Sequence, residues 1–197
     1  MVDTRHRRSP LDRRSPLGDY TVAFAALPIG ARELPFRTQL NLRVDPDSAA
    51  AAAIGKALGG PLPTVPCTAS RLGDAEVLWL GPDEWLLIAE PGQQQALAAT
   101  LREAIGDEDG AVTDVSAQRT AVALTGPKVR EVLARGCSID LHPKVTPIGS
   151  CVQTLLAQTG VVIVVRDELA SDFLLLVRSS FAGYFGDWLI DACTELR

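Results

Sequence analysis

Residues 112–141 read VTDVSAQRTAVALTGPKVREVLARGCSIDL, and their pattern is that of a strand, a turn, a second strand, a helix and an exit loop. Residues 119–124 alternate weakly and are rich in small and β-branched side chains, which favours a strand. Gly126 and Pro127 end that strand. This strand-helix unit indicates a fold, but it does not by itself indicate a chemistry.

The helix that follows is predicted from its first residue and its apolar face. Pro127 suits the first helical position, because no backbone N–H is needed there. Val129, Val132 and Leu133 fall on one apolar face. We predict that Gly136 ends the helix in the left-handed conformation that glycine tolerates.

Length and composition indicate one globular unit. The chain has 197 residues, of which 47% are hydrophobic, and a net charge of −5. It is long enough for one large domain or for two small halves that share a core. Its longest apolar runs, such as 161–165 and 173–177, have the length of strands, so no membrane span is predicted.

The N-terminal end differs from the remainder in charge. Residues 1–17 contain five arginines and two aspartates. We expect residues 1–18 to form a flexible basic arm, either disordered or lying on an acidic partner. No basic stripe with interleaved aromatic residues occurs elsewhere, so no nucleic-acid binding is predicted.

The cysteine pattern favours a reducing compartment. The four cysteines form no C-x-x-C pair, and the arginine-rich start lacks the apolar core of a secretory signal. We therefore expect reduced, mostly buried thiols in a cytoplasmic protein. A zinc site would need His142 together with scattered cysteines, so no metal ligand is assigned.

Hydrophobic periodicity predicts the remaining elements and an internal repeat. Strand 37–44 precedes a capped helix at 49–58, a hairpin at 76–89 that brings Trp79 near Trp85, and a helix at 93–105. The second half repeats this order with strand 119–124, the helix from Pro127, a hairpin of 151–157 and 161–166 that turns at 158–160, and strand 173–177. Ser179 or Ser180 is expected to cap the last helix. One face of that helix carries Phe181, Phe185, Trp188, Leu189, Ala192 and Leu196. The fold class is α+β: two similar halves, 19–110 and 111–197, form one compact unit of mainly antiparallel sheet with helices on one side.

Asp114, Ser116 and Arg119 form the most polar cluster of the central stretch. In the functional interpretation, a carboxylate and a guanidinium face a ligand or a partner subunit. In the structural interpretation, Asp114 or Ser116 caps the turn between two strands and Arg119 pairs with an acid. The structural interpretation is favoured.

No catalytic template is present elsewhere in the chain. There is no G-x-S-x-G, no P-loop and no G-x-G-x-x-G. Asp140 precedes His142 by two positions, which favours hydrogen bonding within a loop. Arg166 and Arg178 lie at strand ends and are open to a partner. No catalytic, cofactor-binding or metal-binding residue is assigned to this chain.

Several collinear segments resemble the γ subunit of heterotetrameric sarcosine oxidase. The similarity covers the chain from about residue 15 to the C-terminus. The segments that carry it are 78–87, 114–121, 126–137, 140–143, 177–182 and 188–189.

The resemblance implies a four-subunit flavoenzyme that oxidatively demethylates sarcosine or a related secondary or N-methylated amine. It assigns FAD, FMN, NAD, tetrahydrofolate and zinc to the partner α, β and δ subunits. The γ subunit then has a shortened form of the aminomethyltransferase fold of the glycine-cleavage T-protein and no catalytic group of its own. The alternative is a freestanding folate-dependent aminomethyltransferase or folate-binding module.

Overall fold

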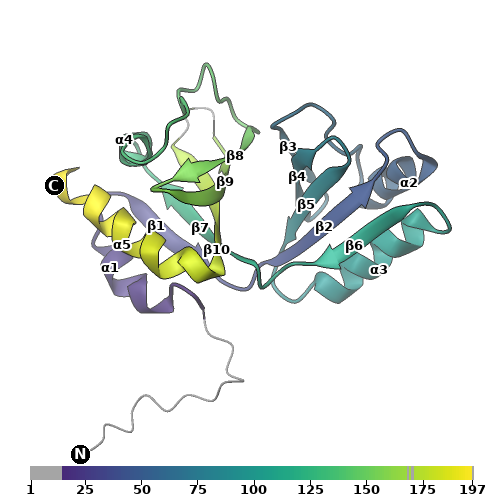
Figure 1. Cartoon of the computed structure of the whole chain (residues 1–197), viewed down its shortest axis with the longest axis horizontal. Coiled ribbons are helices and arrows are strands. Elements are labelled where there is room, and N and C mark those ends of the chain that lie inside the picture. The colour runs from purple at the N-terminus through teal and green to yellow at the C-terminus, as the bar shows by residue number, and fades with distance from the viewer. Residues whose placement is uncertain (1–14, 168, 170, 197) are drawn as a thin grey trace, which may run out of the picture.

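The protein is built from four layers, in which two antiparallel sheets face each other and helices cover their outer sides (Figure 1). The computed structural model describes residues 15–167, 169 and 171–196. Most of the predicted basic arm, residues 1–14, lies outside the described residues. No helix within those described ranges is long and apolar enough to cross a bilayer.

Each sheet has five strands. The first has the order β3-β4-β5-β2-β6 and the second has the order β1-β7-β10-β9-β8. The first comprises β2 (Thr38–Val44), β3 (Ala69–Leu72), β4 (Ala75–Gly81), β5 (Glu84–Ala89) and β6 (Gly110–Asp114). The second comprises β1 (Gly30–Leu34), β7 (Arg119–Thr125), β8 (Cys151–Leu156), β9 (Thr159–Val165) and β10 (Asp172–Arg178).

The helices are short and lie on the outer faces of the sheets (Figure 1). The first sheet is covered by α2 (Ala49–Leu58) and α3 (Gln94–Ile105), and the second by α1 (Thr21–Ala25), α4 (Val129–Ala134) and α5 (Ala182–Ala192). Single 3-10 turns occupy Gly18–Tyr20, Ser179–Phe181 and Thr194–Leu196.

The predicted repeat is confirmed, with one exchange between the halves. Strand β2 corresponds to β7, β5 corresponds to β10, and α3 corresponds to α5, so the two strand orders match when one of them is read in reverse. The edge strands cross over, because β1 pairs with β7 and β6 pairs with β2. Residue 110 is the first residue of β6, so each sheet takes one edge strand from the other half of the chain.

Three apolar clusters explain why the central strands are hydrophobic on both faces. One lies between the second sheet and its helices, and another lies between the first sheet and its helices. The third joins the sheets through Leu78, Leu86 and Ile88 on one side and Leu174 and Leu176 on the other. Strands buried on both faces have continuous apolar sequences, as in residues 173–177.

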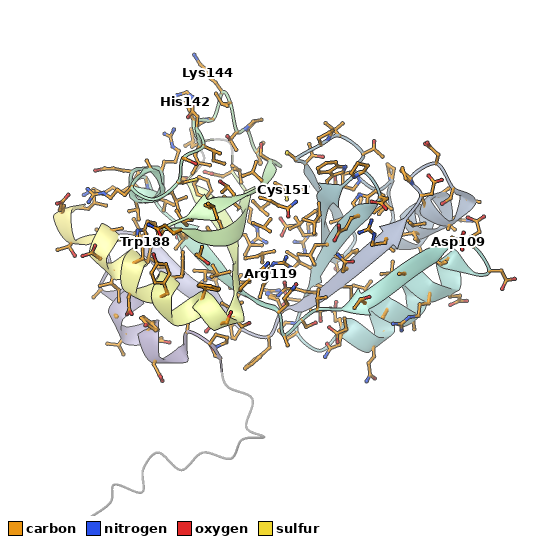
Figure 2. The ribbon with its side chains drawn as sticks, viewed as in Figure 1. Asp109, Arg119, His142, Lys144, Cys151 and Trp188 are labelled. Carbon is orange, nitrogen blue, oxygen red and sulfur yellow. The ribbon has the colours of Figure 1, made fainter. Side chains whose placement is uncertain are left out.

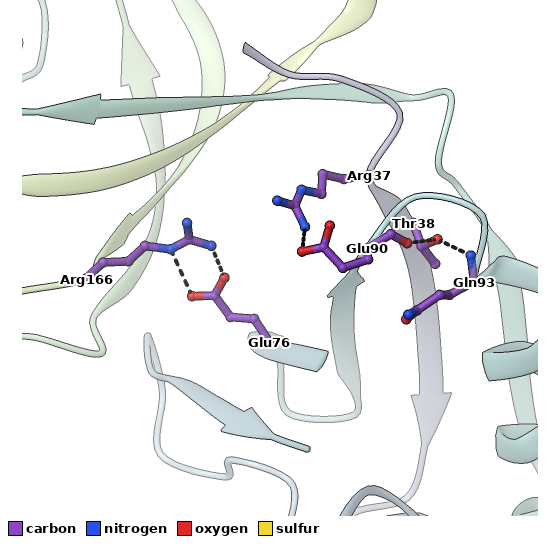
Figure 3. A network of polar contacts seen from close by, with 6 residues as sticks. All are labelled: Arg37, Thr38, Glu76, Glu90, Gln93 and Arg166. Carbon is purple, nitrogen blue, oxygen red and sulfur yellow. Dashed lines mark hydrogen bonds and ion pairs between the residues drawn. The ribbon is translucent and has the colours of Figure 1, made fainter. Parts of the chain in front are cut away.

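The two sheets are also joined directly at one edge. Backbone hydrogen bonds run from Cys151 N to Cys67 O and from Ala69 N to Gly149 O, each 2.7 Å long. Beside them, the guanidinium of Arg166 binds the carboxylate of Glu76 through two contacts (Figure 3). These contacts fix the relative position of the halves.

Local sequence signals placed several elements correctly. Helix α2 has the predicted bounds, and the Ser48 hydroxyl accepts the N–H of Ala51 at 3.1 Å as its cap. Trp79 and Trp85 are directly opposite each other on β4 and β5. Trp85 is fully buried and donates its indole N–H to the Pro63 carbonyl at 2.8 Å, so it is a core residue.

Two predictions about the central helix are wrong. Helix α4 begins at Val129, since Gly126 at φ 118° and Pro127 form a turn before it. Gly136 is absent from the left-handed region. A Cβ atom at Gly136 would lie 2.6 Å from Cζ2 of Trp188, so glycine is required there for close packing and not for a turn.

Three predictions in the last third of the chain are also corrected. The β8–β9 hairpin turns at Ala157 and Gln158, both in the left-handed region, and not at residues 158–160. Contacts from outside the hairpin hold this turn, since Tyr184 Oη donates to the Ala157 carbonyl at 2.6 Å. Neither serine caps α5, because Ser179 Oγ donates to the Ala117 carbonyl at 2.9 Å and Phe181 holds the cap position with no side-chain bond. Phe181 is also 45% exposed, so it does not share the buried face of the helix.

The folded unit begins earlier than predicted. Leu17 is 1% exposed and belongs to the core of the second sheet. Its N–H and the Ser15 hydroxyl both donate to the Glu33 carboxylate. Residues 15–18 therefore belong to the fold and not to an arm.

Candidate functional site

The polar cluster predicted from the sequence lies at the junction of the two halves, around a cavity of about 450 Å³. The connection from β6 to β7 passes through this junction, and the position of Arg119 there is visible in Figure 2. The cavity is lined by Pro16, Phe36, Gln94, Asp114, Ser116, Ala117, Arg119, Thr120 and Ser179. Asp114, Ser116 and Arg119 are thus brought together as predicted.

Asp114 and Ser116 hold the connection between the sheets. The Asp114 carboxylate accepts the N–H of Ser116 at 3.0 Å and its hydroxyl at 2.5 Å, which is an Asx turn. The Ser116 hydroxyl in turn accepts the backbone N–H of Gln39 at 3.0 Å. The structural interpretation of this pair is confirmed, because both side chains satisfy backbone groups.

Gln39 links the same connection to β7, and the sequence pattern did not single it out. Its side chain is 1% exposed, and its Nε2 donates to the Arg119 carbonyl at 2.7 Å. Its Oε1 is buried without a partner among the described residues. The sequence signal that could have identified Gln39 is its position as a polar residue between Thr38 and Leu40 in an apolar strand.

Arg119 differs from the prediction, since it forms no ion pair with a described residue. Its Nη1 donates to the neutral Oε1 of Gln118 at 2.8 Å. Burial lowers the pKa of Arg119, and the charge of Arg178 lowers it further, whereas Glu84 raises it. An arginine guanidinium is not deprotonated in proteins, so Arg119 carries a positive charge.

Glu33 is a second polar centre that the sequence did not reveal. Thr120 is 4% exposed, and its hydroxyl donates to the Glu33 carboxylate, which also receives the bonds from Ser15 and Leu17. Glu33 therefore anchors the start of the fold on β7. It lies within one short edge strand, and no motif surrounds it.

The polar side chains of the loop that contains His142 form hydrogen bonds with the backbone of the same loop. The Asp140 carboxylate accepts the N–H of His142 at 2.8 Å, and His142 Nδ1 accepts the N–H of Lys144 at 3.2 Å. His142 and Lys144 extend from the loop between α4 and β8, well away from Arg119 (Figure 2). The predicted hydrogen bonding within this loop is confirmed.

A larger cavity of about 670 Å³ lies beside α2. It is lined mainly by small and apolar residues, with Lys56 as its one charged lining residue. Among the residues that the structure describes, no group of three His, Cys, Asp or Glu side chains is placed to hold a metal ion. The two cavities have the volume of small-molecule sites, and in the junction cavity the Ser116 hydroxyl donates to the Asp114 carboxylate at 2.5 Å.

The chain has an aminomethyltransferase-like fold. The glycine cleavage system aminomethyltransferase T of Bartonella henselae superimposes with a TM-score of 0.62 at 17% identity, covering 81% of this chain and 45% of the transferase. At that identity the likeness concerns the fold alone.

The chain belongs to the sarcosine oxidase gamma subunit family. The model of that family matches residues 43–195. The sarcosine oxidase subunit gamma of Corynebacterium sp. strain P-1 is 39% identical over 188 residues, covering 93% of this chain and 91% of the relative. A chain of the heterotetrameric sarcosine oxidase from Corynebacterium sp. U-96, solved with pyrrole 2-carboxylate, is also 39% identical, with a TM-score of 0.84 over 93% of this chain and 95% of the other.

Proposed function

We propose that the chain is a non-catalytic γ subunit of a sarcosine oxidase complex in the cytoplasm, where it stabilises α, β and δ partners. Those partners carry FAD, FMN, NAD, tetrahydrofolate and zinc, and oxidatively demethylate sarcosine or a related amine. The observation that carries this proposal is the 39% identity, over nearly the whole length of both chains, to a chain of a solved heterotetrameric sarcosine oxidase.

The hydrogen bonding of the polar residues supports a structural role. Asp114, Ser116 and His142 are the side chains most like catalytic groups, and each of them bonds to a nearby backbone group. A general base needs a free lone pair directed at a substrate. Asp114 Oδ1 and His142 Nδ1 are instead occupied in holding turns.

An exposed apolar surface supports contact with a partner. Val65, Val145 and Ile148 are 64%, 64% and 51% exposed. They lie on two loops that correspond in the repeat, α2 to β3 and α4 to β8, and these loops meet at the Cys67–Cys151 backbone bond. Exposed apolar groups of this kind are typical of subunit contacts.

The proposal is tested in the assembled enzyme. The chain is co-expressed with the flavin-bearing subunits of its complex, and Asp114→Ala and His142→Ala are introduced one at a time. We expect full flavin content and turnover close to that of wild type, while the chain expressed alone binds neither flavin nor zinc. A variant that assembles with full flavin yet loses turnover more than about a hundredfold, roughly 2.7 kcal/mol, would show that this subunit carries chemistry.

The junction cavity favours one second candidate, a folate-dependent aminomethyltransferase or folate-binding module. Its volume of about 450 Å³ is within the range of small-molecule sites, and the fold is that of an aminomethyltransferase. Calorimetric titration of the purified chain with tetrahydrofolate separates the two functions, because only the second requires stoichiometric binding by this chain alone.

A further inference from the structure

Arg119 and Arg178 are directly opposite each other on neighbouring strands of the second sheet. Residues opposite in this way present their side chains on the same face. Arg178 shares its face with Leu174 and Leu176, which pack against the first sheet. Both guanidinium groups therefore lie on the inner side of the sheet.

Neither arginine is neutralised within the described part of the chain. No described acid lies within ion-pair distance of Arg119 or Arg178, and the only side-chain bond of Arg119 is to neutral Gln118. Glu84 is near enough to raise the pKa of Arg119, but its oxygens are held by Asn41 at 2.7 Å and by Arg43 at 3.4 Å. Like charges opposite each other in a sheet are destabilising, so the fold alone gives no reason for this pair.

A small cavity of about 130 Å³ lies against the two guanidinium groups. Gln153 lines it from β8 and Gly160 lines it from β9, and a Cβ atom at Gly160 would meet nothing within 4 Å. The volume is well below that of small-molecule sites, which begin at about 300 Å³. It suits a single carboxylate, the group that arginine binds through paired hydrogen bonds.

Two exposed apolar residues are neighbours, in strand register or in sequence, of residues that line this cavity. Leu155 is directly opposite Gly160 and is 59% exposed, and Phe181, three residues after Arg178, is 45% exposed. Arginine and aromatic side chains are enriched in protein interfaces. A cavity this small and open needs a second surface to hold its anion, which a partner chain provides.

We propose that Arg119 and Arg178 together bind one carboxylate from an acidic side chain of a neighbouring subunit. This inference rests on the proposed function, since it requires the assembled complex. The arginine pair is then a docking point whose positive charge is neutralised only when the partner subunit is bound. Removal of the carboxylate from such a contact costs binding free energy, so the arginine pair should stabilise the assembled complex.

The test uses the co-expressed complex, purified through a tag on another subunit and washed with increasing NaCl. We expect Arg119→Gln and Arg178→Gln to lower retention of this chain at least about tenfold at physiological salt. Arg178→Lys, which keeps the charge, should retain more of the chain than Arg178→Gln. Arg71→Gln, at an exposed arginine of β3, is the matched control and should not change retention.

The outcomes distinguish this inference from the proposed function. If the wild-type chain does not co-purify with the flavin-bearing subunits, the proposed function fails. If the wild type co-purifies and both glutamine variants are retained like the control, the docking inference is wrong. If retention is unchanged but inorganic phosphate, at constant ionic strength, raises the unfolding midpoint of wild type and not of the variants, the pair binds a free anion and the partner assignment is overturned.

Discussion

Arg166, at the end of β9, forms a two-contact ion pair with Glu76 on β4 and so links the two sheets (Figure 3). The Glu76 side chain is 14% exposed and the Arg166 side chain is 30% exposed. A planar guanidinium that meets a carboxylate through two contacts in a partly buried setting is the strong form of this interaction. The sequence had left Arg166 open to a partner, but it pairs within the chain.

The first prediction concerns this link. Glu76→Gln should lower the free energy of unfolding by about 1.5–3 kcal/mol, because it leaves a half-buried guanidinium with a weaker acceptor. Urea unfolding of the purified chain measures the loss. Glu131→Gln is the control, since Glu131 is 59% exposed and lies 3.8 Å from Arg135 within one helix. It should cost less than about 0.5 kcal/mol. Equal losses in the two variants would contradict a special role for the Arg166 pair.

A second prediction concerns Gly136. In Gly136→Ala the new methyl group would lie 2.6 Å from Cζ2 of Trp188 and 3.0 Å from the backbone N of Ala157. The hairpin backbone or the last helix must then shift, at a cost of about 1–3 kcal/mol for overpacking. Gly160→Ala is the control in the same hairpin, because nothing lies within 4 Å of its Cβ position. The comparison is made by thermal unfolding, and a neutral Gly136→Ala variant would show that the contact relaxes freely.

Local signals account for the elements that the sequence predicted. Ser48 and Gly59 mark the two ends of α2, and both act through bonds within a few residues. The central stretch 112–141 was likewise correct in its order of strand, turn, strand and helix. In these places a segment's own residues determine its conformation.

Long-range pairing accounts for what the sequence missed. Strand β1 is five residues long with one buried position, and it is a strand because it pairs with β7. Strands β6 and β7 follow each other in sequence but belong to different sheets. No local sequence pattern predicts that β6 and β7 belong to different sheets. None predicts that Arg119 lies opposite Arg178 either. The candidate site was therefore predictable as a polar cluster, but its hydrogen bonds and charges were not.

A third prediction concerns pH. The Asp167 carboxylate accepts two bonds from Ser171, at 2.5 and 2.6 Å, and the N–H of Asp172 at 2.9 Å. Burial alone would raise the pKa of Asp167, but these bonds and one from Leu169 outweigh it, so the pKa lies below its ordinary value. A lowered pKa contributes stability above the ordinary value of about 3.9, and this is lost as the pH falls through the folded value.

Asp167→Asn should therefore be less stable than wild type at pH 7, and the difference should shrink as the pH falls below about 4. Urea midpoints measured from pH 7 to pH 3 test this dependence. Asp109→Asn, at the exposed end of the loop before β6 (Figure 2), is the control at an exposed site. A constant difference for Asp167→Asn across the range would show that charge is not the cause.

The last prediction uses the two cysteines whose backbones join the sheets. Cys67 is exposed at φ 60°, whereas Cys151 is 1% exposed (its place between the sheets is labelled in Figure 2). Burial, and then the neighbouring Cys67 and Glu76, raise the pKa of the Cys151 thiol to about 12. Only the thiolate is a nucleophile, so at pH 8 Cys151 should be inert in the folded chain while Cys67 reacts with a disulfide reagent such as DTNB. Cys67→Ser should abolish the rapid phase, and peptide mapping should find Cys151 modified only after urea unfolding. Rapid modification of Cys151 in the native chain would mean that the two sheets separate at this edge, because no other route exposes a thiol packed between them.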